Sequence, residues 1–240
     1  MVYFRIRNGT IILFQTKGRY ILNSVIITGA GTGLGRELAL KYGKEGYHLI
    51  LIGRSEESLS EVKKQLNNAH IVVMDIRIKQ EVDKNIKTLL KEYKVVGLIN
   101  NAGIGFFGPF EKVKENEFEE MFQTNVLGTM YMTQAVLPNI YESDGSFVMN
   151  IISTAGLRGK VNEVAYVASK FAVRGFTESL QKEYEEKPVL ISAVYMGGMN
   201  TPFWNGSEHV KDPTKFRSPA EVAEIIFSQK EQECIVIESK

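Results

Sequence analysis

The segment Tyr166-Val167-Ala168-Ser169-Lys170 places a phenol and an ammonium four residues apart. In a helix, residues at this spacing share one face. At about 4 Å and an effective dielectric constant near 20, the lysine charge is worth about 4 kcal/mol, or roughly three pKa units. The pKa of the tyrosine, ordinarily about 10, would then approach neutrality, where the phenol can exchange the proton of an alcohol–ketone interconversion. The spacing alone is common, so the assignment needs support from other motifs.

A second candidate site is the glycine-rich segment from Thr28 to Gly35, which separates an apolar run at 25–28 from helical spacing at 36–42. Glycines there let the chain turn tightly and let backbone N–H groups approach a pyrophosphate at a helix N-terminus. The pattern is T-G-x-x-x-G-x-G, and its place after the first core strand favours a dinucleotide site over a plain strand–helix turn. The residues expected to hold the cofactor here are Gly29, Gly31, Thr32, Gly33, Leu34 and Gly35.

Arg54 follows the next apolar run, at 48–52. Sites that prefer NAD usually place an acidic residue there, on the ribose 2′-hydroxyl. No carboxylate in Gly53-Arg54-Ser55 would repel a 2′-phosphate, and a guanidinium can pair with one bidentately, so NADP is favoured over NAD. The alternative is that Arg54 is an ordinary solvated arginine.

Seven short β-branched runs, separated by segments with helical spacing, must position these groups. They span 25–28, 48–52, 71–74, 95–100, 146–152, 189–195 and 234–237. Continuous apolar runs are expected when helices cover both faces of a parallel sheet. The sequence therefore predicts an α/β fold: a Rossmann-like, doubly wound, seven-stranded parallel sheet, with residues 22–240 as one domain.

Residues 1–21 differ from the rest of the chain. Phe4 and Ile6 alternate with Arg5 and Arg7, and Asn8-Gly9 follows, which is the strongest short-range hairpin signal. We expect an N-terminal extension that is either a β-hairpin or disordered.

Composition excludes several classes of protein. The 240 residues carry a formal net charge of +1, so no global field recruits nucleic acid or an anionic membrane. Apolar runs stop far short of the roughly 20 residues that a membrane span needs. Cys234 is the only cysteine, which excludes an internal disulfide and a thiolate zinc cluster and fits the cytoplasm. With no H-E-x-x-H and no G-x-S-x-G, neither metal-dependent chemistry nor a hydrolase is expected.

These motifs closely resemble, in type and in order along the chain, those of the short-chain dehydrogenase/reductase family, of the type with about 250 residues. The resemblance covers residues 22–237. The resemblance adds Asp75 near adenine, and Asn101, Ala102 and Gly103 of an N-N-A-G segment along the cofactor. It also implies a catalytic set, which comprises Asn125, Ser153, Tyr166 and Lys170. After the sixth strand the family commonly has V-x-P-G-x-x-x-T, of which Gly197 and Thr201 remain, while Met196 replaces the proline and is expected to loosen that loop.

The resemblance implies hydride transfer between NADP(H) and a carbonyl–alcohol pair. Tyr166 would transfer the proton, Ser153 would hydrogen-bond the substrate oxygen, and Lys170 would lower the pKa of the tyrosine and hold the nicotinamide ribose. Asn125 would position the water that reprotonates the site. The rival interpretation is a catalytically silent regulatory protein that senses the dinucleotide, which would need the glycine turn but not these four residues.

Two segments should border the nicotinamide, 103–110 and 201–205. Both supply aromatic rings and no charge before Glu111 and Glu208. Such pockets bind neutral, fairly flat molecules best, so we expect reduction of neutral apolar or aromatic ketones or diketones. His209 follows this region, and we expect it to be exposed rather than in contact with substrate.

The helices expected near 111–137 and 166–184 carry apolar residues on more than one face, including Phe122 and Phe171. One sheet face should not need all of them. Family resemblance implies that these helices pair across a two-fold axis, so a homodimer or homotetramer is expected.

Overall fold

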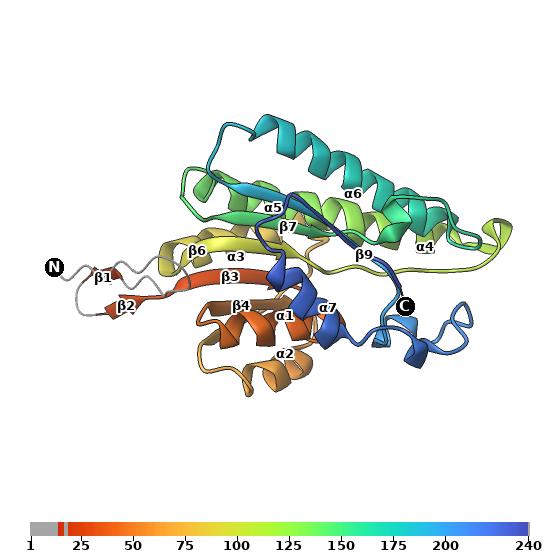
Figure 1. Ribbon diagram of the computed structural model, residues 1–240, viewed down its shortest axis with the longest axis horizontal. Coiled ribbons are helices and arrows are strands. Elements are labelled where there is room, and N and C mark those ends of the chain that lie inside the picture. Colours follow the sequence, from red (N-terminus) through yellow and green to blue (C-terminus); the bar gives the residue numbers. More distant parts are fainter. Residues whose placement is uncertain (1–13, 17–18, 240) are drawn as a thin grey trace.

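Seven parallel strands form the central sheet (Figure 1). The computed structural model of the chain describes residues 14–16 and 19–239. The strands are β3 (Asn23–Thr28), β4 (His48–Gly53), β5 (Ala69–Val73), β6 (Lys94–Asn100), β7 (Phe147–Ile151), β8 (Leu190–Met196) and β9 (Cys234–Ile237). Their order across the sheet is β5-β4-β3-β6-β7-β8-β9. The predicted seven-stranded, doubly wound fold is confirmed, and each of the seven apolar runs lies on one of these strands.

Helices cover both faces of the sheet (Figure 1). On one face lie α1 (Gly33–Lys44), α2 (Glu56–Lys63) and α7 (Pro219–Ser228). The other face carries α3 (Lys79–Glu92), α5 (Thr129–Val136) and α6 (Val164–Glu183). Because the sheet is enclosed, successive residues of β3 face opposite cores: Ile26 packs toward α3 and α5, whereas Val25 and Ile27 pack toward α1. This two-sided burial explains why the strands are continuously apolar.

The segment predicted as a helix near 111–137 is interrupted. After a short 3-10 turn, η1 (Phe110–Lys112), the helix α4 (Glu115–Met121) leads into the π-helical segment η2 (Phe122–Gly128), and α5 follows. Segments of π-helix are rare and occur often at functional sites. Asn125 lies in the middle of this one.

The chain reverses its direction of travel across the sheet at β3. From β3 it passes to β4 and β5 on one side, and it then returns to β6 on the other. Ligands of doubly wound sheets bind at such switch points, beyond the carboxyl ends of the strands. The glycine turn after β3 lies at this place, as does the segment after β6.

A separate antiparallel pair precedes the sheet. It consists of β1 (Phe14–Thr16) and β2 (Arg19–Ile21), with Phe14 opposite Ile21. The hairpin predicted around Asn8-Gly9 lies outside the described residues. Among the residues that the structure does describe, no helix is long and apolar enough to cross a bilayer.

Candidate active site

The turn between β3 and α1 is a backbone cradle. Gly29 and Gly33 have φ values of +63° and +53°, which residues with a Cβ rarely adopt. A Cβ on Gly31 would lie 2.4 Å from Ser58 Oγ of α2. Glycine is therefore required for the geometry of the turn and for the approach of α2. The N-terminus of the 12-residue helix α1 lies directly after the turn, where backbone N–H groups and the helix dipole favour an anion.

The segment after β6 locks this cradle. The backbone N–H groups of Asn101 and Ala102 donate to Thr28 Oγ1 at 3.0 and 3.1 Å. Asn101 Nδ2 in turn donates to the carbonyl oxygens of Thr28 and Gly29, at 3.0 and 3.3 Å. Four hydrogen bonds thus join two segments about 70 residues apart, which fixes the floor of the cleft.

Gly35 does not line the cleft, and its predicted contact with the cofactor stays a prediction. A Cβ at this position would lie 2.2 Å from the carbonyl oxygen of Gly29 and 2.5 Å from Asn101 Nδ2. Its lack of a side chain lets α1 pack directly behind the turn. Gly35 therefore shapes the cradle from behind.

Arg54 and Asp75 lie together at one end of the cleft, as predicted, with Arg77 as a third residue. Arg77 Nε donates to Asp75 Oδ1 and Oδ2 at 3.0 and 2.9 Å, and Nη2 donates to Oδ2 at 2.6 Å. Burial alone would raise the pKa of Asp75, but the hydrogen bonds and charge of Arg77, together with the charge of Arg54, bring it below its ordinary value. Of the charged side chains that line this end of the cleft, two are guanidinium groups and one is a carboxylate, while Glu81 Oε2 accepts from the N–H of Asp75 at 3.1 Å.

Ser153, Tyr166 and Lys170 meet at the carboxyl end of β7. Tyr166 and Lys170 project from α6, and each is only 5% exposed. Lys170 Nζ donates to the carbonyl oxygen of Ile151 at 3.3 Å and lies 5.6 Å from the centroid of the Tyr166 ring. Ser153 has a φ of +133°, a strained value for a residue with a side chain, and its Oγ accepts from the N–H of Ala155 at 3.2 Å.

Burial, rather than the lysine charge, dominates the pKa of the phenol. Burial raises the pKa of Tyr166, a side-chain hydrogen bond with Ser153 opposes the change, and the charge of Glu163 adds to it. Burial also lowers the pKa of Lys170, to about 8. The expectation that Lys170 brings the pKa of the tyrosine toward neutrality is therefore wrong for this structure, because both groups have lost their water.

Asn125 does not line the cleft, and its predicted catalytic role stays a prediction. Its Oδ1 accepts from the N–H of Ile104 at 2.9 Å, and its Nδ2 donates to the carbonyl oxygen of Ile104 at 2.9 Å. The same Nδ2 donates to Ser169 Oγ at 3.0 Å. Asn125 thus ties the segment after β6 to α6, the helix that carries Tyr166 and Lys170.

The segment after β8 closes the cleft from the other side. Met196, in place of the family's proline, is the last residue of β8 and pairs with Ile237 of β9. The N–H of Gly197 donates to the carbonyl oxygen of Ile237 at 2.8 Å, and the N–H of Gly198 donates to Ser239 Oγ at 3.0 Å. Hydrogen bonds from these two backbone N–H groups therefore hold the start of the loop that the loss of proline was expected to loosen.

An aromatic wall surrounds Tyr166. Phe107 lies at its centre, with ring centroids 5.4 Å from Tyr166, 5.9 Å from Phe203 and 5.3 Å from Trp204. Phe203 and Trp204 line the cleft, whereas Phe107 packs behind them. Segments 103–110 and 201–205 thus both contact Tyr166, through Phe107 and Phe203, while the prediction that they border the nicotinamide stays a prediction.

Lys160 and Glu163 also line the cleft, although they lie outside the two segments that were predicted to border the nicotinamide. Glu163 Oε1 lies 2.9 Å from Nε2 of His209, whose ring stacks on Phe107 at 4.8 Å. His209 is half-buried, so the prediction that it is exposed is wrong. The sequence spacing could have indicated that Glu163 lies near the site, since it precedes Tyr166 by one helical turn.

The whole cleft has a volume of about 510 Å³. It brings together every predicted site residue except Gly35 and Asn125, namely Gly29, Gly31, Thr32, Gly33, Leu34, Arg54, Asp75, Asn101, Ala102, Gly103, Ser153, Tyr166, Lys170, Gly197 and Thr201. In the described part of the chain, no group of three His, Cys, Asp or Glu side chains is arranged to hold a metal ion.

Comparison with known proteins indicates the class. The short chain dehydrogenase family matches residues 23–211. The oxidoreductase YciK of Escherichia coli is 30% identical over 207 residues, which cover 82% of each chain. The closed form of a serine dehydrogenase complexed with NADP⁺ superposes with a TM-score of 0.82 at 28% identity, covering 90% of this chain and 93% of the other. An alcohol dehydrogenase from the archaeon Thermococcus sibiricus, complexed with 5-hydroxy-NADP, gives a TM-score of 0.79 at 27% identity and covers 90% and 94%.

This chain belongs to the short-chain dehydrogenase/reductase family, and it is an oxidoreductase of that family.

Proposed function

We propose that the protein uses NADP(H) to interconvert a carbonyl and an alcohol by hydride transfer, and that it acts mainly as a reductase. The observation that carries the proposal is the convergence of Ser153, Tyr166 and Lys170 at one end of a cleft whose floor is a glycine cradle. The dinucleotide would supply or accept the hydride at the end of the cleft that these three side chains line.

The cradle fits a dinucleotide. The turn 29–34 and the N-terminus of α1 would hold the pyrophosphate. Gly29 and Gly31 have no side chain that could block the approach of a phosphate to the backbone N–H groups, and Cβ atoms there would meet Ala102 and Ser58. Asp75 and Arg54 would face the adenosine, and Gly197 and Thr201 would face the nicotinamide.

The choice of NADP over NAD rests on charge. Arg54 lines the cleft together with Asp75, and Asp75 is already paired with Arg77. A 2′-phosphate would therefore meet a guanidinium that can bind it bidentately. The two solved relatives described above hold NADP⁺ and 5-hydroxy-NADP.

The proton chemistry would belong to Tyr166. Because burial raises its pKa, the phenol stays protonated near pH 7 and can donate to a carbonyl oxygen as hydride arrives at the carbon. Ser153 would hydrogen-bond the same oxygen. Lys170, with a pKa of about 8, is mostly charged at pH 7 and would stabilise the tyrosinate left behind.

The aromatic wall supports a flat, largely apolar substrate such as an aryl ketone or diketone. The relatives named above act on serine and on alcohols, so the family accommodates both charged and neutral molecules. Which of these this pocket favours depends on Lys160 and Glu163.

A silent dinucleotide sensor is the alternative function, and one assay separates the two. NADPH oxidation is followed against a panel of ketones, diketones and aldehydes, with NADPH binding measured in parallel by its fluorescence. Turnover with any member of the panel supports the enzyme. Tight NADPH binding without turnover on the whole panel supports the sensor and contradicts our proposal.

We also propose a homodimer or homotetramer. Phe122 of η2 and Val164 and Phe171 of α6 are large apolar side chains that remain exposed in the single chain. Neighbouring residues of these helices, such as Met121 and Val173, are already buried in the core, so the exposed set is available for another subunit. A monomer by light scattering at micromolar concentration would contradict this.

A further inference from the structure

Glu163 is a nearly buried carboxylate in the wall of the cleft that the proposed chemistry does not use. It is only 7% exposed and precedes the first turn of α6, where Tyr166 follows three residues later. Its side chain does not cap the helix. A charged group held out of water needs partners, and those partners come from two other segments.

One partner is His209 and the other is Lys160. Glu163 Oε1 lies 2.9 Å from His209 Nε2, and Glu163 Oε2 lies 3.9 Å from Lys160 Nζ. The imidazole is held in turn by its stacking on Phe107. The carboxylate is therefore fixed between the aromatic wall and a lysine that also lines the cleft.

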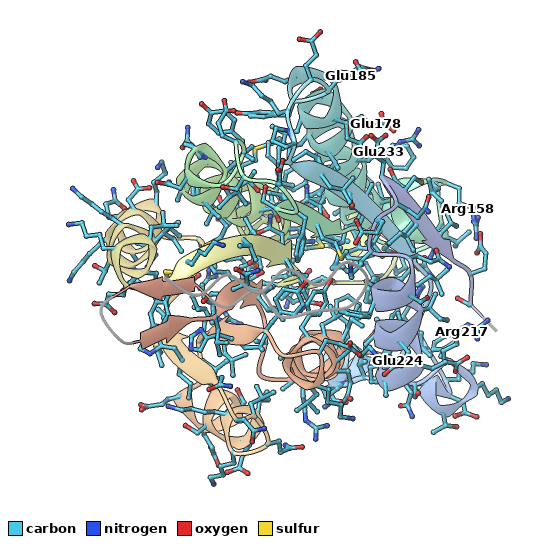
Figure 2. All side chains as sticks on the ribbon, turned by 60° about the vertical axis from the view of Figure 1, so that its left-hand side comes forward. Arg158, Glu178, Glu185, Arg217, Glu224 and Glu233 are labelled. Atoms are coloured by element: carbon cyan, nitrogen blue, oxygen red, sulfur yellow. The ribbon has the colours of Figure 1, made fainter. Side chains whose placement is uncertain are left out.

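Lys160 is the cation in this loop that a substrate carboxylate would meet. Arg158, two residues earlier, lies at the rim of the molecule (Figure 2), where its two guanidinium nitrogens donate to Glu238 at 3.1 and 2.7 Å. Arg158 is exposed and does not line the cleft. A pocket with an unopposed Lys160 would attract keto acids, but here Glu163 opposes it.

We propose that Glu163 is a specificity-determining residue that keeps the pocket from favouring carboxylates, because its negative charge offsets the positive charge of Lys160. The proposal rests on the proposed function and deepens it. It explains how a cleft with a lysine in its wall can select neutral carbonyl compounds, since the two opposite charges offset each other and an entering anion would lose its water without gaining a net positive partner.

The first test compares phenylglyoxylate, a keto acid, with its neutral amide. In the unaltered enzyme, kcat/KM for the amide should exceed that for the acid by at least roughly tenfold, a factor that corresponds to about 1.4 kcal/mol. Lys160→Met should not lower this ratio, because Glu163 already offsets the lysine charge and is left unopposed by Lys160 in the variant. A preference for the acid that Lys160→Met removes would overturn the proposal, because Lys160 would then be a carboxylate receptor.

The second test removes the charge of Glu163. Glu163→Gln keeps the length of the side chain and an oxygen that can accept from His209, so the aromatic wall keeps its support. The kcat/KM ratio of acid to amide should rise at least roughly tenfold, and the double variant Lys160→Met/Glu163→Gln should lose that gain. An unchanged ratio would overturn the proposal, because a purely structural role would alter both substrates alike.

Glu178→Gln is the matched control on the same helix. Glu178 lies on the outer side of α6 (Figure 2), where its Oε1 pairs with Arg174 Nε at 2.7 Å in solvent. This variant should leave the acid-to-amide ratio unchanged. A rise in the ratio equal to that of Glu163→Gln would show that net charge alone moves it, and the proposal would fall.

The tests remain informative if the proposed function fails. If no carbonyl compound is turned over, the proposed function fails, and calorimetric binding of benzoate and benzamide to the enzyme–NADP⁺ complex measures the charge preference instead. Tighter binding of benzamide supports the role of Glu163. Equal or tighter binding of benzoate contradicts it.

Discussion

The cofactor cradle and the aromatic wall are built in opposite ways. The cradle consists of contiguous backbone in the turn 28–35, locked by Asn101. The wall consists of side chains from three separate segments, represented by Phe107, Tyr166 and Phe203, and Glu163 lies beside it. A backbone site is encoded by short local motifs of glycine, whereas a side-chain site depends on which distant segments the fold brings together. Variants that affect the cradle and spare the wall, or the reverse, test whether the two regions act independently.

Tyr166→Phe should have the largest effect. The phenyl ring keeps the packing against Phe107 but cannot donate a proton, so turnover should fall by at least about two orders of magnitude, the usual scale of general acid–base assistance. The dissociation constant for NADPH, measured by fluorescence, should change little because the cradle is untouched. Turnover near that of the unaltered enzyme would remove Tyr166 from the chemistry.

Gly35→Ala should break the cradle and spare the wall. The added Cβ would lie 2.2 Å from the carbonyl oxygen of Gly29, so α1 or the turn must shift. Overpacking of this kind costs about 1–3 kcal/mol, and cofactor affinity should fall by roughly tenfold or more. Gly175→Ala is the matched control, since a Cβ there meets nothing within 4 Å and α6 should gain about 0.5–1 kcal/mol. Calorimetric titration with NADPH and thermal unfolding measure both, and unchanged affinity in Gly35→Ala contradicts the assignment.

Arg54→Ala tests whether Arg54 binds the 2′-phosphate at the adenosine end of the cleft. Charge-assisted hydrogen bonds to a 2′-phosphate contribute about 1.5–3 kcal/mol, so the unaltered enzyme should prefer NADPH over NADH by roughly tenfold or more, and the variant should lose most of this preference. The ratio of kcat/KM for the two cofactors measures it. Equal values in the unaltered enzyme would remove Arg54 from the site.

The smallest expected effect is that of Lys170 on how the free energy of unfolding depends on pH. Its pKa in the folded protein is about 8, below the ordinary value of 10.5, because burial disfavours the charge. Between these pH values the unfolded chain binds more protons, so the free energy of unfolding should rise with pH, by on the order of 1 kcal/mol per pH unit. Below about pH 8 the buried charge destabilises the fold by a constant amount. Lys170→Met should remove this slope between about pH 8 and 10 in urea unfolding, and an identical slope in both proteins would contradict it.

The sequence predicted the backbone features of the site better than the contacts between distant side chains. The seven strands and the turn 28–35 were predictable because buried strands and glycine turns have local signatures. The positions of Asn125 and Gly35 outside the cleft were not, because they depend on how α6 and α1 pack. The pKa of Tyr166 was misjudged because spacing gives the distance to a charge but not the burial of both groups. Glu163 was missed because its importance comes from His209, 46 residues away.

The π-helical segment η2 makes chain length at Asn125 as constrained as residue identity. A π-helical turn accommodates one more residue than an α-helical turn, so a deletion of one residue between 122 and 128 would allow α4 to continue into α5 as ordinary α-helix. The wide turn absorbs its extra residue, so α4 and α5 would keep their places, whereas residues inside the turn would move around the helix axis by up to about 100°, the turn per residue of an α-helix. Asn125 would leave Ile104 and Ser169, although no side chain at the site had been altered. Homologous chains should therefore tolerate substitutions along this segment more readily than insertions or deletions.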